Sequence, residues 1–73
     1  MLTIADLKQL IHLGGGVHID AGHYTTDDLK ACALLAKGSG ARIVLANAKC
    51  LTIADMKAIA HLGAGQIVFE LVG

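Results

Sequence analysis

Three side chains near residue 20 have the chemistry of metal ligands. On a β-strand, His18 and Asp20 would point to the same face, and His23 follows in the next turn. The two imidazoles and the carboxylate would then approach one ion. Because no residues that would orient such ligands stand out nearby, we favour a solvated strand end. A metal-dependent enzyme is kept as the alternative.

The two cysteines raise a second possibility, nucleophilic chemistry. Cys50 precedes a predicted helix, and a helix N-terminus stabilises the thiolate that acts as nucleophile. No acid or base partner stands out near Cys50, so we favour an inert thiol and keep a thiol enzyme as the alternative. Cys32 falls on the apolar stripe of a helix, which predicts a small core side chain.

A glycine run at Gly14–Gly16 has the composition of a phosphate-binding loop. Such a loop follows a strand and precedes a helix, so that the free amides of the helix face the phosphate. Here the run follows a predicted helix and precedes a predicted strand, which indicates a helix stop instead. The sequence thus predicts no cofactor and no catalytic residue, and therefore a protein that is not an enzyme.

Charge and aromatic content argue against nucleic acid as a partner. Six basic residues balance six acidic ones, and Arg42 is the single arginine. Neutralising phosphates needs clustered basic side chains, and stacking on single strands needs more aromatic rings than those of Tyr24 and Phe69. We therefore expect no nucleic-acid partner.

The distribution of apolar residues argues against a membrane protein. No apolar run reaches the length of a membrane span, and Met1 leads into a capped helix rather than a signal peptide. We therefore expect a cytoplasmic protein that does not bind membranes, with reduced cysteines. Yet 55% of the residues are apolar and only 16% are charged. In so small a chain, part of this apolar surface is expected to stay exposed, which favours self-association.

The candidate residues lie on three copies of one short unit. Residues 2–16 read LTIADLKQLIHLGGG and residues 51–65 read LTIADMKAIAHLGAG, with ten of fifteen positions identical. Residues 24–35, YTTDDLKACALL, form a diverged copy. Self-similarity at a short, regular period is typical of stacked repeats. We expect a single domain of three repeats, spanning about 2–23, 24–50 and 51–73.

Each copy predicts one helix followed by one strand. Thr3, Thr25 and Thr52 each stand three residues before an aspartate, which is the pattern of a helix N-cap. A helical apolar period follows, then glycines, and then a β-branched segment that indicates a strand. The strands are expected at residues 17–19, 42–45 and 66–69. This order predicts an α/β solenoid with a parallel sheet of order 1-2-3 and its helices on one face.

The pattern resembles the α/β solenoids of the leucine-rich-repeat type. Ile43, Leu45 and Asn47 alternate as in the strand-and-asparagine segment of that family. The resemblance covers nearly the whole chain. It implies a protein-interaction scaffold and brings no catalytic residue with it.

The predicted sheet leaves one face without helices. Counting from Gly16, Gly40 and Gly65 places five side chains toward the helices: Val17, Ile19, Ile43, Leu45 and Val68. The opposite face then carries His18, Asp20, Arg42, Val44, Ile67, Phe69 and Leu71. This face becomes more apolar toward the C-terminus, and parallel sheets are rarely bare on one side. We therefore predict an interface formed by Val44, Ile67, Phe69 and Leu71.

The last predicted strand indicates how the chain assembles. Residues 66–73 contain one charged side chain, Glu70, and an unprotected apolar edge strand tends to pair with another chain. We favour a homodimer through this strand and the bare face, while a ring or filament would follow from head-to-tail contact. The alternative function is a binding module for another protein.

Overall fold

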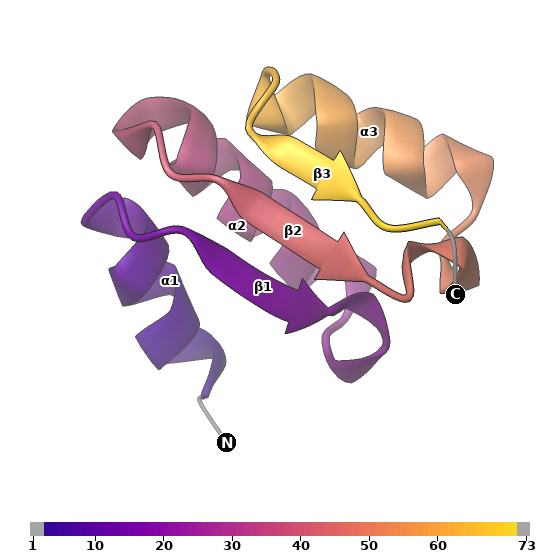
Figure 1. Cartoon of the computed structure of the whole chain (residues 1–73), viewed down its shortest axis with the longest axis horizontal. Coiled ribbons are helices and arrows are strands. Elements are labelled where there is room, and N and C mark those ends of the chain that lie inside the picture. The colour runs from indigo at the N-terminus through magenta and orange to yellow at the C-terminus, as the bar shows by residue number, and fades with distance from the viewer. Residues whose placement is uncertain (1–2, 72–73) are drawn as a thin grey trace.

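Helices and strands alternate along the part of the chain that the computed structural model describes, residues 3–71 (Figure 1). The elements, in order, are α1 (Ile4–His12), β1 (Val17–Asp20), α2 (Thr26–Ser39), β2 (Ile43–Ala46), α3 (Ile53–Gly63) and β3 (Ile67–Phe69). The longest helix, α2, has 14 residues. Within residues 3–71, no helix combines the length and the apolar character needed to cross a membrane.

The three strands form an open parallel sheet of order β1-β2-β3, so the predicted α/β class and strand order are confirmed. All three helices lie behind this sheet in Figure 1, and its front is left uncovered. In the register, Val17 pairs with Ile43, and Ile43 pairs with Ile67. One row of side chains therefore crosses the sheet from edge to edge at each level of the strands.

Each α-helix begins at the predicted threonine. The hydroxyl oxygens of Thr3, Thr25 and Thr52 each accept a hydrogen bond of 3.1 Å from the backbone amide of the aspartate three residues later. All three threonines have extended backbone conformations, as an N-cap requires. The aspartates also place a negative charge in the first turn, where the positive end of the helix dipole stabilises it.

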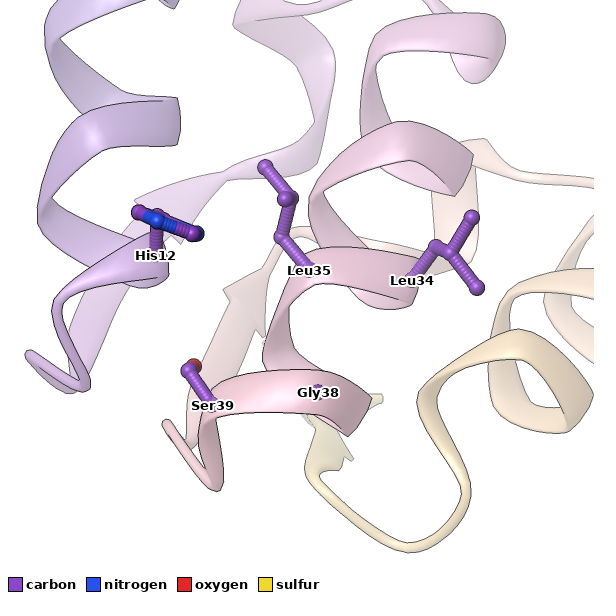
Figure 2. A pocket seen from close by; sticks show the side chains of 5 residues that line it. All are labelled: His12, Leu34, Leu35, Gly38 and Ser39. Atoms are coloured by element: carbon purple, nitrogen blue, oxygen red, sulfur yellow. The ribbon is translucent and has the colours of Figure 1, made fainter.

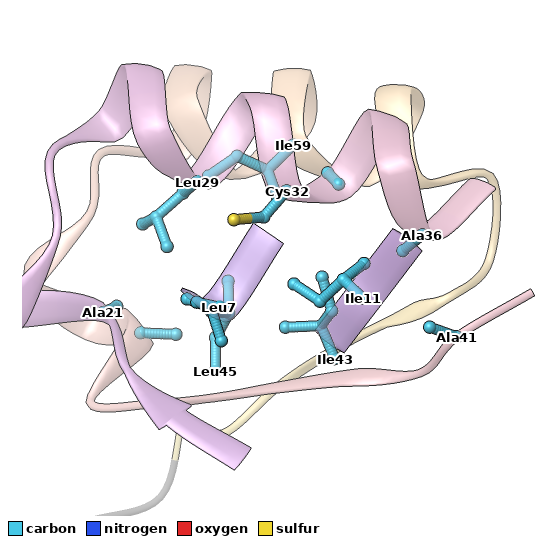
Figure 3. Packing of buried hydrophobic residues seen from close by; sticks show 12 residues of the cluster. Leu7, Ile11, Ala21, Leu29, Cys32, Ala36, Ala41, Ile43, Leu45 and Ile59 are labelled. Carbon is cyan, nitrogen blue, oxygen red and sulfur yellow. The ribbon is translucent and has the colours of Figure 1, made fainter. Parts of the chain in front are cut away.

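The core lies between the helices and the sheet (Figure 3). Ile43 and Leu45 project from the central strand toward buried side chains of all three helices, which include Leu7, Ile11, Leu29, Cys32 and Ile59. Cys32 is 1% exposed, so the prediction of a core cysteine is confirmed. Because β2 and α2 have neighbours on both sides, they contribute several of the buried side chains, among them Leu29, Cys32, Ile43 and Leu45.

A short 3-10 turn follows each of the first two strands, which the sequence analysis did not predict. The turns span Ala21–His23 and Ala48–Cys50, and in each the first alanine is buried. Asp20 opens the first turn by accepting a 2.7 Å hydrogen bond from the Gly22 amide. Asn47 opens the second in a left-handed conformation without such a side-chain bond. A shared signal was present, because each buried alanine stands four residues before a threonine cap.

Candidate functional site

The three potential metal ligands near residue 20 do not converge. Asp20 uses its carboxylate to cap the following turn, and His23 is exposed at the end of that turn. The His18 side chain reaches Glu70 instead. Within residues 3–71, no group of three histidine, cysteine or acidic side chains is placed to hold a metal ion. The geometry that the metal hypothesis needs is therefore not found.

His18 and Glu70 form a hydrogen bond across the uncovered sheet face, which is an ion pair when the imidazole is protonated. The distance from His18 Nε2 to Glu70 Oε1 is 2.9 Å, although the two residues lie 52 positions apart in the sequence. His18 stands on β1 and Glu70 follows β3, so their side chains meet over the central strand. The sequence analysis missed Glu70, because only the sheet order brings the two residues together.

The two cysteines lie in contrasting environments. Burial raises the pKa of the Cys32 thiol, an effect that Lys8 opposes and Asp28 reinforces. Lys8 belongs to α1 and Asp28 to α2, so both charges flank the contact between these helices. Cys50 is exposed, and its thiol has no hydrogen-bond partner within residues 3–71. Neither environment assembles a nucleophile with a base.

Two hollows of the surface are partly open to solvent. One of about 240 Å³ lies between the ends of α1 and α2 and is lined by His12, Leu34, Leu35, Gly38 and Ser39 (Figure 2). The Ser39 hydroxyl is already engaged there, since it donates to the Ile11 carbonyl and accepts from the Ala41 amide. This hollow is therefore a seam between neighbouring helices, and within residues 3–71 the His12 imidazole is the polar side chain of its lining that makes no hydrogen bond.

A second hollow, of about 290 Å³, lies on the uncovered face of the sheet. Its lining residues are Gly16, Val17, His18, Arg42 and Val44. The hollow begins at the outer edge of the sheet, on β1, and is open to solvent. It offers an accessible backbone segment beside two polar side chains, which is a suitable surface for another polypeptide.

The predicted orientation of β3 is wrong by one residue. Ile67 and Phe69 pair with Ile43 and Leu45 and pack against the core, so they face the helices. Val68 faces the uncovered side instead. A side chain added at Gly63 of α3 would collide with Ile67 Cγ1, which shows how closely this strand and helix approach. Of the predicted interface residues, Ile67 and Phe69 therefore do not lie on the bare face.

The physical reason for this error is the way α3 ends. Each helix is followed by a residue in the left-handed conformation: Gly14 with φ 92°, Gly40 with φ 80° and Ala64 with φ 48°. The strand residue three positions later is Val17, Ile43 and Ile67 respectively, and these residues form one row in the sheet. Counting from Gly65 shifted the third strand because Ala64, a residue that rarely adopts this conformation, ends the helix.

The corrected uncovered face is mixed in character. Val44 lies on it as predicted, between His18 and Val68 in the register. The ion pair of His18 and Glu70 lies beside these two valines. Leu71 follows β3 and is exposed. The apolar part of this surface is therefore smaller than predicted and lies at Val44 and Val68.

Strand β3 is an edge of the sheet. The Glu70 amide donates to the Leu45 carbonyl at 3.0 Å, so the backbone alternation turns the Phe69 amide away from β2. Within residues 3–71, no strand lies on that outer side. The outer amides of this edge are therefore free to receive another strand.

The chain has no significant match to any protein-family model, curated protein or solved structure. The resemblance to leucine-rich repeats thus stays an expectation from the sequence. What the geometry itself offers is an open sheet with two edges and one uncovered face, and such features are used to bind polypeptide chains.

Proposed function

We propose that this chain is a protein-interaction module, a short α/β solenoid that associates with copies of itself through edge strand β3 and the adjoining uncovered face. The observation that carries this proposal is the free edge of β3. Its backbone amides are available on one side, and its side chains are apolar. The proposal assigns no catalytic activity to the chain.

The backbone of β3 supports this use because it is already arranged as a strand. Adding a strand to an existing edge needs no refolding of the sheet, and its main-chain hydrogen bonds supply affinity. Edges of this kind are normally protected by charged side chains, proline or a covering loop. The strand Ile67–Phe69 has none of the first two, and no described segment covers it.

The uncovered face supplies a second, smaller contribution. Val44 and Val68 are neighbours on it, and Leu71 lies beyond the end of β3. Removing these apolar side chains from water on association is favourable in proportion to the area buried. The ion pair of His18 and Glu70 borders this patch and would orient the incoming surface.

The test is the molar mass in solution, measured by size-exclusion chromatography with light scattering from low to high micromolar concentration. Leu71→Lys should reduce association because it places a charge at the proposed contact. Leu34→Lys is the matched control, since Leu34 and Leu71 are both 55% exposed but Leu34 lies on α2 away from the edge. We expect wild type and Leu34→Lys to associate more strongly than Leu71→Lys.

The contribution of the edge backbone can be isolated in a synthetic chain. N-methylation of the Phe69 amide removes one of the outward donors of this edge and keeps the side chain in the core. We expect this chain to remain folded and to lose association. Equal association of the methylated and unmethylated chains would show that β3 does not pair through its backbone. A wild type that stays monomeric over the whole concentration range would defeat self-association and favour binding to another protein.

A further inference from the structure

The outer helices α1 and α3 bury opposite sides, although their sequences are closely similar. Equivalent positions follow from aligning Asp6, Asp28 and Asp55. In α1 the side facing α2 is buried at Leu7 and Ile11. Their equivalents in α3, Met56 and Ala60, are half-buried and exposed. This side of α3 therefore has the residues of a helix contact without a helix against it.

The reverse holds for the other side. In α3 the side facing α2 is buried at Ile59, which is 0% exposed, and at Gly63. The equivalent of Ile59 in α1 is Leu10, which is 43% exposed, whereas the equivalent of Gly63 is Gly14, which follows the end of α1. The side of α1 that faces away from α2 is thus exposed, whereas the equivalent side of α3 is buried against α2.

The middle helix shows what happens when both sides have a neighbour. Four residues of α2 occupy the positions concerned and all are buried: Leu29 and Ala33 on one side, Cys32 and Ala36 on the other. Ala33 also lies against α3, because its Cβ is 3.6 Å from the position a Cβ would take on Gly63. The equivalent contact between two molecules would bring the side of α3 with Ala60 against the side of α1 with Leu10 in the next molecule.

Exposed apolar side chains gather at these two unused sides. Leu13 is 79% exposed on α1, whereas its equivalents Leu35 and Leu62 are half-buried. Ile53 is 64% exposed on α3, whereas its equivalent in α1, Ile4, is half-buried. A helix arriving at either end would therefore cover large apolar groups that solvent now contacts.

Charged residues follow the same rule. Three lysines occupy equivalent positions on the side of each helix that faces the next repeat: Lys8, Lys30 and Lys57. They are half-buried in α1 and α2 and exposed in α3. Three aspartates occupy equivalent positions on the side of each helix that faces the preceding repeat: Asp6, Asp28 and Asp55. They are exposed in α1 and half-buried in α2 and α3. The exposed members, Lys57 and Asp6, have opposite charges and would face each other across a contact between two molecules.

The backbone edges are complementary as well. The Val17 amide of β1 donates to the Arg42 carbonyl, and the Ile43 amide of β2 donates to the Gln66 carbonyl, both at 2.9 Å. If the same hydrogen-bond pattern continued from β3 into β1 of another molecule, the Ile67 amide would donate to the Gly16 carbonyl of that molecule. Gly16 is exposed and lines the hollow on the uncovered face, so this carbonyl is accessible.

We propose that the partner of β3 and α3 is the β1 and α1 end of a second copy of this chain, so that molecules join head to tail into one continuous parallel sheet. The proposal rests on the self-association proposed above and specifies its geometry. Because the two contacting surfaces differ, association does not stop at a two-fold dimer but continues to a ring or filament. This geometry replaces the symmetric dimer favoured by the sequence analysis.

The test uses two variants, each blocked at one end. Leu10→Lys with Leu13→Lys blocks the α1 end, and Ile53→Lys with Ala60→Lys blocks the α3 end. All four positions are exposed, so circular dichroism and thermal melting should show folded chains. Lysine at both blocked ends prevents a new attraction between them. Leu34→Lys serves as the control for adding charge elsewhere.

We expect each blocked variant alone to be a monomer and their equimolar mixture to form a one-to-one dimer of twice the chain mass. The mixture contains one intact α1 end and one intact α3 end, so association must stop at two chains. Leu34→Lys should associate like wild type. Blocked variants that associate like wild type, while Leu71→Lys does not, would overturn the head-to-tail geometry and leave self-association standing. Wild type that never associates would overturn both.

Discussion

The two ends of the molecule have nearly the same sequence and opposite surroundings. Residues 2–16 and 51–65 share ten of fifteen positions, yet α1 buries the side on which Leu7 and Ile11 lie, and α3 buries the side on which Ile59 lies. Within residues 3–71, each of these two helices packs mainly against α2, on opposite flanks. Burial of a given position therefore follows its place in the layer, and the side chains differ as well: Met56, Ile59 and Ala60 stand in α3 where Leu7, Leu10 and Ile11 stand in α1.

Local interactions, in contrast, are the same at both ends of the molecule. The threonine caps of α1 and α3 make the same bond at the same distance, because a cap depends on its own first turn and on no neighbouring helix. The comparison thus separates two kinds of stabilisation. Packing should differ between equivalent positions of the two ends, whereas capping should not.

The largest difference is expected between Ile59→Ala and Leu10→Ala. Ile59 is fully buried, so its truncation should lower the free energy of unfolding by about 2–5 kcal/mol. Leu10 is part-exposed, and its truncation should cost less than about 1 kcal/mol. Chemical denaturation below the concentration of any association measures both. Equal losses at the two equivalent positions would contradict the opposite burial of the ends.

The caps should respond alike at both ends. Thr3→Ala and Thr52→Ala are each expected to lower the free energy of unfolding by about 1 kcal/mol through the loss of one amide hydrogen bond. Thr→Ser at the same sites keeps the hydroxyl and is the control. Denaturation midpoints that differ strongly between the two alanine variants would show that the caps are not local features.

Ala64→Gly should stabilise the α3 end. Ala64 ends this helix with φ 48°, where glycine carries no penalty, and the equivalent turns use Gly14 and Gly40. The expected gain is about 0.5–1 kcal/mol, since glycine relieves strain but adds freedom to the unfolded chain. Thermal melting measures it, with Gly40→Ala as the reverse change. An unchanged or lower melting temperature in Ala64→Gly would argue against a strained helix end.

The smallest effect is expected for the ion pair that links the two ends. His18 and Glu70 are both substantially exposed, so His18→Ala and Glu70→Ala should each cost roughly 0.5 kcal/mol or less. A double-mutant cycle measures the coupling between them. A coupling energy well above 1 kcal/mol would mean that this pair is a main tie across the sheet.

Much of the fold could be predicted from local signals. Thr25 and the aspartate three residues later mark a helix start without reference to the rest of the chain, and the helix–strand alternation gives the sheet order. The orientation of β3 could not be predicted because it depends on Ala64, which ends α3 in the left-handed conformation although alanine rarely adopts it. Phe69 was consequently assigned to the wrong face.

The candidate site was harder to predict because it depends on which side of each outer helix has no neighbouring helix among the described residues. Leu10 and Ile59 look alike in the sequence, and only the neighbours of their helices make one exposed and the other buried. The same applies to Glu70, which joins His18 through the sheet order alone. The exposed surfaces at the two ends of the helix layer can therefore be identified only from the folded structure.

The most direct test of the account is the mass of the wild-type chain, measured by sedimentation velocity over a broad range of concentrations. One chain has a mass of 7.5 kDa. If the two ends are complementary, the species observed should be whole-number multiples of this mass, and larger multiples should grow as concentration rises. A single species of one chain at every concentration would contradict the account.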